Sequence, residues 1–412
     1  MPLSRGPLSS RNFRLLMTCN VISVGGSAVA FVAVPFAVLS VGGSASDVGF
    51  VATAELIPLT AFLLLGGVIA DRLPRHLVMV AAVTLQAAAQ GTAAALLLTG
   101  HARVWQLIAL AGVGGVGIGF FYPAEQGLLP QTVPAGQQAP AIALDRTVRN
   151  AASIGGAALG GLLTGFAGPG WGLAIDAASF AVGGVLLAAL HFPALPPAEV
   201  SSMLHDLREG WQEFVSRRWL WTIVLQFGLV TAAAAGAIDV LGPLVAHAHL
   251  GGARSWGVIV AAYSAGAVIG GLVMIRFRPR RMLVAAVLSV PAFSVILFAL
   301  AVPLPVPLDV AAAFFSGCCL EVLSVCWFTT LQQEIPPDKL SRISSYDAFG
   351  AYALTPVGTA VAGPLADAFG TRAVLAVSGV VIAVFPLFLL FEPEIRRLRR
   401  KPPPSAPGPA AH

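Results

Sequence analysis

The sequence predicts an all-α polytopic membrane protein with twelve transmembrane helices, arranged as two six-helix halves. Of its 412 residues, 57% are hydrophobic and only 10% are charged, whereas soluble domains carry about 25% charged residues. Apolar runs of about 20 residues, the length that crosses a bilayer, recur along the whole chain. This composition excludes a soluble enzyme, a nucleic-acid-binding protein, a secreted disulfide scaffold and a disordered chain, because a soluble fold needs more polar surface.

The predicted helices follow one another with short connections. The first apolar run follows several arginines but has no cleavage site before a soluble domain, so we interpret it as a membrane helix and not as a signal peptide. The first six predicted spans are 13–39, 47–69, 77–99, 104–128, 146–167 and 171–191. The second six are 219–246, 254–275, 281–301, 308–331, 343–365 and 371–391.

A single long polar segment separates the two sets of helices. We expect an N-terminal six-helix half at residues 1–191, a cytoplasmic linker at 192–218, a C-terminal six-helix half at 219–391, and a disordered basic and proline-rich tail at 392–412. The linker has apolar residues such as Leu207, Trp211 and Phe214 at helical spacing, which predicts an amphipathic helix. It either lies along the membrane surface or is an ordinary linker. The near-equal halves suggest an internal duplication.

The basic residues predict the orientation. With the N-terminus inside, all but three of the 24 lysines and arginines fall in inner segments, the exceptions being Arg103, Arg254 and Arg372. Positive charge collects on the cytoplasmic side of membrane proteins, so both termini are expected there. The net charge of +5 is then explained by this topology, and a nucleic-acid partner is not needed to account for it. Only Lys339 and Lys401 are lysines, which is typical of a GC-rich bacterial genome, so we expect a multi-pass protein of the bacterial plasma (inner) membrane.

We find no pattern that predicts an enzyme, a metal site or a cofactor. The four cysteines lack ligand spacing and sit in apolar runs, where a cysteine is a small buried residue. The Gly-x-Gly-x-x-Gly pattern at residues 112–117 lies inside a predicted membrane helix with no strand before it, which favours helix packing over dinucleotide binding. No phosphate-binding loop, histidine cluster or nucleophile–base pattern is present.

The most specific local motif lies between the second and third helices. Residues 66–76 read Gly-Gly-Val-Ile-Ala-Asp-Arg-Leu-Pro-Arg-His. Gly67 permits close approach of two helices, Asp71 ends a helix, and Arg72 and Arg75 flank the turn. The segment resembles the signature loop of the major facilitator superfamily, although Pro74 stands where that motif has glycine.

Further stretches resemble the bacterial efflux branch of this superfamily, which includes macrolide and siderophore exporters. They lie at residues 122–130, 176–180, 332–336 and 363–370. The glycines of residues 155–161 resemble an antiporter motif, with Gly156 in place of proline, but the helix 4 arginine of drug–proton antiporters is absent. The resemblance implies a monomer that moves a small molecule by alternating access, with protons as coupling partners and no cofactor.

Ionisable residues within the predicted helices are functional candidates, because charge at bilayer depth costs at least about 2.5–3.5 kcal/mol. Glu55 and Glu321 lie near the middle of their spans, whereas Asp176 and Asp239 lie nearer the outer face. Acids near the inner face are expected to form structural pairs with arginines; these are Glu125, Asp145, Glu334 and Asp347, with Arg146, Arg149 or Arg342 as partners.

The resemblance also implies that helices 1, 4, 7 and 10 line a central cavity. The candidates for contact with substrate or protons are Glu55, Glu321, Asp239, Asn20, Tyr122, Gln226 and Trp327. The candidates for a conformational switch are Gly67, Asp71, Arg72 and Arg75. We expect a secondary transporter that exports a drug-like compound or metabolite by proton antiport. An importer or uniporter, and a non-transporting membrane sensor or assembly factor with the same fold, are the alternatives.

Overall fold

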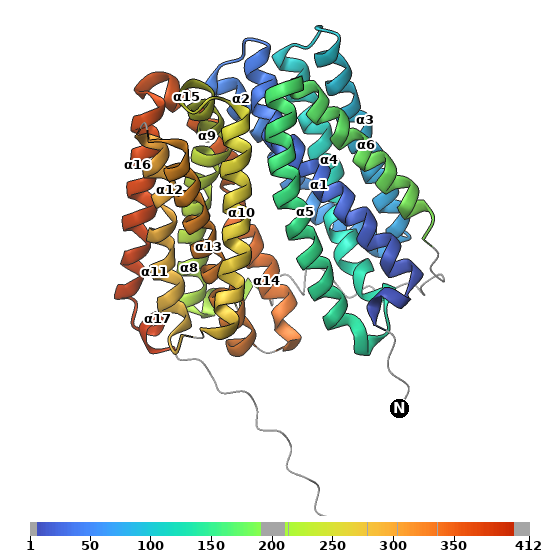
Figure 1. The fold of residues 1–412 in the computed structure, drawn as a ribbon. Helices are drawn as coiled ribbons and strands as arrows, with labels where there is room; N and C mark the ends of the chain where they lie inside the picture. Colours follow the sequence, from blue (N-terminus) through green and yellow to red (C-terminus); the bar gives the residue numbers. More distant parts are fainter. Residues whose placement is uncertain are drawn as a thin grey trace, which may run out of the picture.

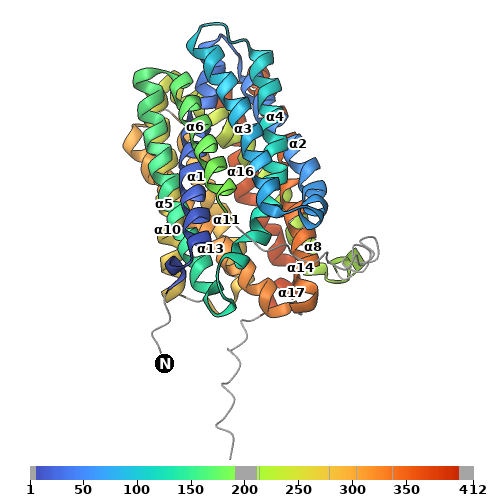
Figure 2. The same ribbon diagram turned by 90° about the vertical axis from the view of Figure 1, so that its right-hand side faces the viewer.

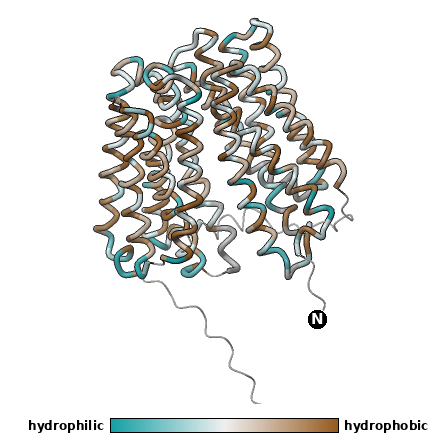
Figure 3. The backbone as a smooth tube through the Cα atoms, in the orientation of Figure 1, coloured by the Kyte–Doolittle hydropathy of each residue, from teal (hydrophilic) through white to brown (hydrophobic). Residues whose placement is uncertain are grey.

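The computed structural model describes residues 6–190, 211–212, 214–277, 279–302, 304–335 and 337–398, and every regular element in these ranges is helical. Within them, ten helical stretches are long and apolar enough to cross a membrane. The predicted fifth span falls within α5 (Gln138–Ala167), and the predicted eleventh falls on α14 (Pro337–Tyr352) and α15 (Thr355–Phe369). Hydrophobic residues cover the middle of the bundle and hydrophilic residues gather at its ends (Figure 3). The predicted all-α polytopic class is confirmed.

The first half is a bundle of six long helices. They are α1 (Arg11–Ser40), α2 (Ala45–Arg72), α3 (Arg75–Leu98), α4 (Val104–Leu128), α5 and α6 (Pro169–Ala188). Helix α1 packs against α5 and α6, α4 packs against α2 and α3, and α3 packs against α6. Figure 2 shows α1, α3, α4 and α6 along one side of this half. Glycines allow several of these close crossings; at Gly156 a Cβ would lie 2.8 Å from the Ala28 Cβ.

The second half contains more interruptions. Its elements are α8 (Arg218–Ala235), η4 (Gly236–Leu241), α9 (Gly242–His249), α10 (Ala253–Arg276), α11 (Met282–Phe293), α12 (Val295–Ala301), α13 (Val306–Glu334), α14, α15, α16 (Thr371–Val384), η5 (Phe385–Phe391) and α17 (Pro393–Arg397). Helix α13 packs against α10 and α11, and α15 packs against α8 and η4.

Prolines explain two of these interruptions. A helical proline has no N–H for the carbonyl four residues earlier, and its ring clashes with that carbonyl. Pro243 affects Asp239 in this way, and the chain there forms η4, a π-helical turn. Pro356 affects Tyr352, where α14 ends. The predicted spans 219–246 and 343–365 are therefore broken helices.

The two halves meet mainly at one end of the molecule. Helix α5 packs on α10, α2 packs on α15, and α1 and α2 also contact α9 and η4. Helices α8 and α14 continue η4 and α15 toward the opposite end, and among the described residues they form no comparable packing with the first half. The halves converge near α9 and α15 and diverge toward the end where the chain begins (Figure 1). We call these the closed end and the open end.

Polar and cationic contacts hold the closed end. The Ser46 Oγ donates to the Asp367 Oδ2 at 2.5 Å. On the other seam, the Arg254 guanidinium lies 3.5 Å from the centroid of the Phe166 ring, an arrangement stabilised by cation–π attraction. These contacts join α2 to α15 and α10 to α5.

The end of the predicted linker helix packs on the second half. Phe214 is buried, and its ring centroid lies 5.8 Å from that of Tyr346 in α14. Trp211 stacks on Phe214 with ring centroids 5.9 Å apart. Residues 191–210 and the tail from 399 onward lie outside the described residues, so the other parts of the predicted linker and tail stay predictions.

Candidate functional site

A cavity of about 910 Å³ lies between the two halves. All six helices α1–α6 line it from the first half, and α8, η4, α10, α11, α12, α13 and α14 line it from the second. Its wall is mostly apolar and includes nine aromatic side chains, among them Phe31, Trp256, Tyr263 and Phe293. Cavities of 300–1,000 Å³ with few polar groups are typical binding sites for organic molecules.

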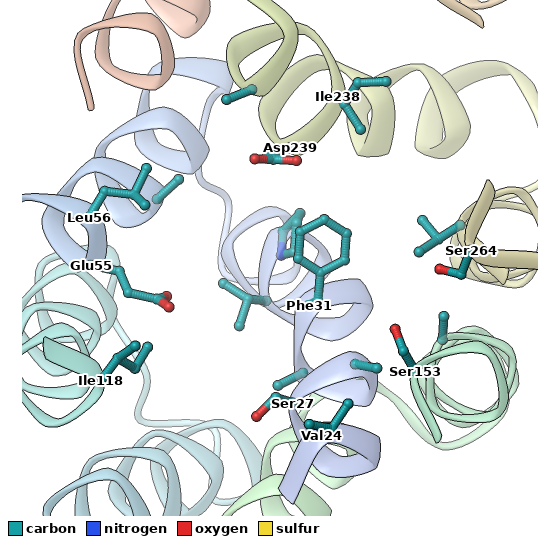
Figure 4. A pocket seen from close by; sticks show the side chains of 18 of the residues that line it. Val24, Ser27, Phe31, Glu55, Leu56, Ile118, Ser153, Ile238, Asp239 and Ser264 are labelled. Carbon is teal, nitrogen blue, oxygen red and sulfur yellow. The ribbon is translucent and has the colours of Figure 1, made fainter. Parts of the chain in front are cut away.

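Glu55 and Asp239 place carboxyl groups in this cavity from opposite halves. Glu55 belongs to α2 and Asp239 to η4, and Figure 4 shows both side chains pointing into the space that the Phe31 ring also enters. Neither carboxyl group has a hydrogen bond or ion pair within the part of the chain that the structure describes. The two predicted candidates therefore share one cavity, with their charges open to a ligand or a proton.

The local sequence explains the position of Asp239. The π-helical turn inserts an extra residue into the helix, as often happens at functional sites, and so rotates Asp239 relative to a regular helix. Gly236 begins the turn, and a Cβ there would lie 2.6 Å from the Gly358 carbonyl oxygen of α15. The turn is held in place by the close contact of Gly236 with α15 and by the proline at residue 243.

Asp176 also belongs to the cavity wall, but its carboxyl group accepts hydrogen bonds from protein side chains. It is only 1% exposed, and its Oδ1 accepts hydrogen bonds from the Ser27 Oγ at 3.3 Å and the Ser179 Oγ at 3.4 Å. The bond from Ser27 ties α6 to α1, whereas the bond from Ser179 lies within α6. Asp176 is therefore a structural acid as well as part of the wall.

An ion-pair network forms the wall nearer the open end. Arg149 of α5 pairs with Glu125 of α4, and its Nη1 lies 3.7 Å from the Asp145 Oδ2. The Asn20 Nδ2 of α1 donates to the Asp145 Oδ1 at 3.0 Å. The predicted structural pairing of these inner acids with Arg149 is confirmed. Asn20, which we predicted to face the cavity, is instead 2% exposed and belongs to this network.

The other predicted contact residues divide between the cavity and the protein interior. Tyr122 lines the cavity. Gln226 donates to the Phe385 carbonyl oxygen, and the Trp327 Nε1 donates to the Asp347 Oδ2 at 3.0 Å. Glu321 lies beside α10, where a Cβ on Gly271 would be 3.5 Å from its Cγ. Gln226, Trp327 and Glu321 are absent from the described cavity wall.

The predicted switch loop is described only in part. Helix α2 ends at Arg72 and α3 begins at Arg75. The surroundings of Gly67, Asp71 and Arg72 are not described beyond their place in α2, so the switch stays a prediction.

The sequence left the aromatic wall unpredicted. Phe31, Tyr263 and Phe293 sit in apolar runs rich in other large hydrophobic residues. The sequence of such a run does not show which side of the helix faces the cavity, because the rotation of a helix about its axis is set by packing against its neighbours.

Comparison with known proteins identifies the family. Residues 3–403 match the family described as transmembrane secretion effector. The chain is 31% identical over 416 residues to the enterobactin exporter EntS of Escherichia coli, covering 95% of this chain and 94% of that protein. It is 26% identical over 409 residues to the multidrug efflux pump Tap of Mycolicibacterium fortuitum, covering 96% and 97%.

Solved structures show the same fold. The nucleoside transporter NupG superposes with a TM-score of 0.75 at 14% identity, covering 92% of this chain and 99% of that one. A bacterial homologue of the lysosomal transporter Spinster, in an inward-facing and unoccupied conformation, superposes with a TM-score of 0.70 at 15% identity, covering 97% and 100%. The chain belongs to the transmembrane secretion effector family of the major facilitator superfamily.

Proposed function

We propose that this chain is a secondary transporter that exports a small organic molecule across the bacterial inner membrane in exchange for protons. One observation carries the proposal: a large apolar cavity lies between two halves that touch at one end and diverge at the other. Rocking of the halves would open the closed end and close the open end around the same site, which is alternating access.

The basic residues support an orientation with the open end in the cytoplasm. Arg11 and Arg14 begin α1 at the open end, and Arg276 ends α10 there. Arg103, Arg254 and Arg372 lie at or next to the first residues of α4, α10 and α16, and these helix ends belong to the closed end. By the positive-inside rule this distribution supports both termini in the cytoplasm, and in that orientation the conformation described here would take up substrate from the cytoplasm.

The direction and the coupling rest on different observations. Two similar proteins are named an efflux pump and an exporter, which supports export. Glu55 and Asp239 support proton exchange, because burial favours the protonated form of a carboxyl group and a conformational change that alters its surroundings releases the proton. We propose that the protein acts as a monomer and that Asp71 and Arg75 stabilise one conformation from the cytoplasmic side. Asp71→Asn, at normal expression, would then slow transport.

Reconstitution into lipid vesicles tests the proposal. An inward-directed or outward-directed pH gradient is imposed, and a panel of cationic, neutral and anionic organic compounds is screened for gradient-dependent movement and counter-movement of protons. We expect at least one compound to move against its gradient when protons move down theirs. Compound movement that ignores the proton gradient would indicate a uniporter. If no compound moves in vesicles, and if the variants Glu55→Gln and Glu321→Gln keep the protein's function in cells, the chain would be a sensor.

A further inference from the structure

The cavity wall has a strong imbalance of charge. It contains four carboxyl groups, from Glu55, Glu125, Asp176 and Asp239, and a single basic side chain, Arg149, among the described residues. No histidine or lysine belongs to the described wall. The guanidinium of Arg149 is engaged by Glu125 and lies 3.7 Å from Asp145. An anionic ligand would therefore find no free cation in the wall, and it would face Glu55 and Asp239.

The unengaged carboxyl groups and the aromatic rings are complementary to one kind of ligand. Glu55 and Asp239 have no protein partner among the described residues, and they approach the cavity from opposite halves (Figure 4). The aromatic residues Phe31, Phe227 and Tyr263 line the same cavity. A ring face attracts a cation, and this attraction increases where water is excluded. Carboxylates in an apolar wall attract a cation more strongly than they do in water.

We infer that the ligand of this cavity is a lipophilic organic cation, held between the Glu55 and Asp239 carboxylates and the aromatic wall. The inference rests on the proposed transport function and specifies its substrate class. The volume of about 910 Å³ accommodates a cation with several rings. Because the two carboxylates belong to different halves, a bound cation links both halves and accompanies them as they rock.

Two ions of the same shape and opposite charge give the sharpest test. Tetraphenylphosphonium and tetraphenylborate are measured separately for binding to the purified full-length protein. We expect tetraphenylphosphonium to bind at least about tenfold more tightly than tetraphenylborate. We expect the double variant Glu55→Gln/Asp239→Asn to lose this preference.

Asp309→Asn is the matched control. Asp309 is a buried acid, 1% exposed, in the first turn of α13, and it is not part of the described cavity wall. The control should keep the full preference, and an unchanged size-exclusion profile shows that each variant is folded. Equal or tighter binding of tetraphenylborate by the wild type would overturn the inference, and so would a double variant that keeps the preference.

The inference and the proposed function can fail separately. Gradient-driven transport of a neutral or anionic compound, with no preference for tetraphenylphosphonium, would contradict the cation inference and leave the transporter intact. A clear preference for tetraphenylphosphonium, with no movement of any compound in vesicles, would support the cation site and contradict the transport function.

Discussion

At the scale of single residues, the cavity distinguishes acids that have protein partners from acids that have none. Asp176 accepts hydrogen bonds from two serines, and Glu125 pairs with Arg149. Glu55 and Asp239 face the cavity without such partners among the described residues. An intramembrane acid without a protein partner is costly and marks a candidate functional site, so the unpartnered pair is the better candidate for transport chemistry.

We predict that Asp239→Asn reduces proton-coupled transport more than Glu321→Gln does. Asp239 enters the cavity at the π-helical turn, whereas Glu321 lies beside α10 and outside the described cavity wall. Initial transport rates of the two variants in vesicles, normalised to the amount of inserted protein, provide the comparison. A larger loss in Glu321→Gln would move the coupling site from the cavity to the α10–α13 contact.

The Arg149 network should be structural. Arg149→Met leaves Glu125 and Asp145 as buried acids without their cation, and removing one partner of a buried ion pair costs about 3–5 kcal/mol. We expect a markedly lower melting temperature for the purified variant. Adding Glu125→Gln removes one of the unpaired charges and should restore much of the loss. A melting temperature unchanged in Arg149→Met would show that the network contributes nothing to the fold.

At the scale of helices, the closed end depends on backbone contact between α5 and α10. A Cβ on Gly161 would lie 2.8 Å from the Gly257 Cα, too close for two such atoms without movement of the helices. Gly155 lies on the same helix, and a Cβ there would meet nothing within 4 Å. The two glycines of α5 therefore differ in what surrounds them, although both lie in the same sequence motif.

We predict opposite outcomes for the same substitution at these two glycines. Gly161→Ala should destabilise the described conformation by about 1–3 kcal/mol, the usual cost of overpacking. Gly155→Ala should be neutral or slightly stabilising, because alanine is favoured over glycine in a helix by up to about 1 kcal/mol. Thermal unfolding in one detergent compares them. Equal stability of the two variants would contradict the tight α5–α10 contact.

The positions of the helices could be predicted from the sequence, but the cavity could not. Apolar runs gave every span to within a few residues except the fifth and the eleventh, where α5 begins at Gln138 and α14 at Pro337, whereas the predictions began at 146 and 343. The first eight residues of α5 include the polar Gln138 and Asp145, so the apolar run begins later than the helix. Depth along a helix follows from residue number, and by depth Glu321 lay nearer the middle of its span than Asp239 did. Rotation follows from packing, so the sequence could not show that Asp239 lines the cavity and Glu321 does not.

At the scale of the whole molecule, the two halves contact each other mainly at one end, the closed end. Besides the packing of α5 on α10 and of α2 on α15, specific polar contacts join the halves at that end. A serine–aspartate hydrogen bond and a threonine pair, Thr53 and Thr359, join α2 to α15, with the threonine hydroxyl oxygens 2.9 Å apart. These polar contacts lie beside one cluster of buried apolar residues, to which α1, α2, η4, α9, α10 and α15 all contribute. Transport requires that they separate in each cycle.

The most direct test of this account is a cross-link across the closed end. Ser46→Cys and Asp367→Cys are combined in a chain whose four cysteines are replaced, and a short thiol-reactive cross-linker is applied, since the two side chains lie in hydrogen-bond contact. Either single-cysteine variant serves as a control. We expect cross-linking to occur efficiently, to abolish transport in vesicles, and to be reversed with recovery of transport when the linker is cleaved. Full transport by the cross-linked protein would contradict the proposal that the closed end opens in each cycle.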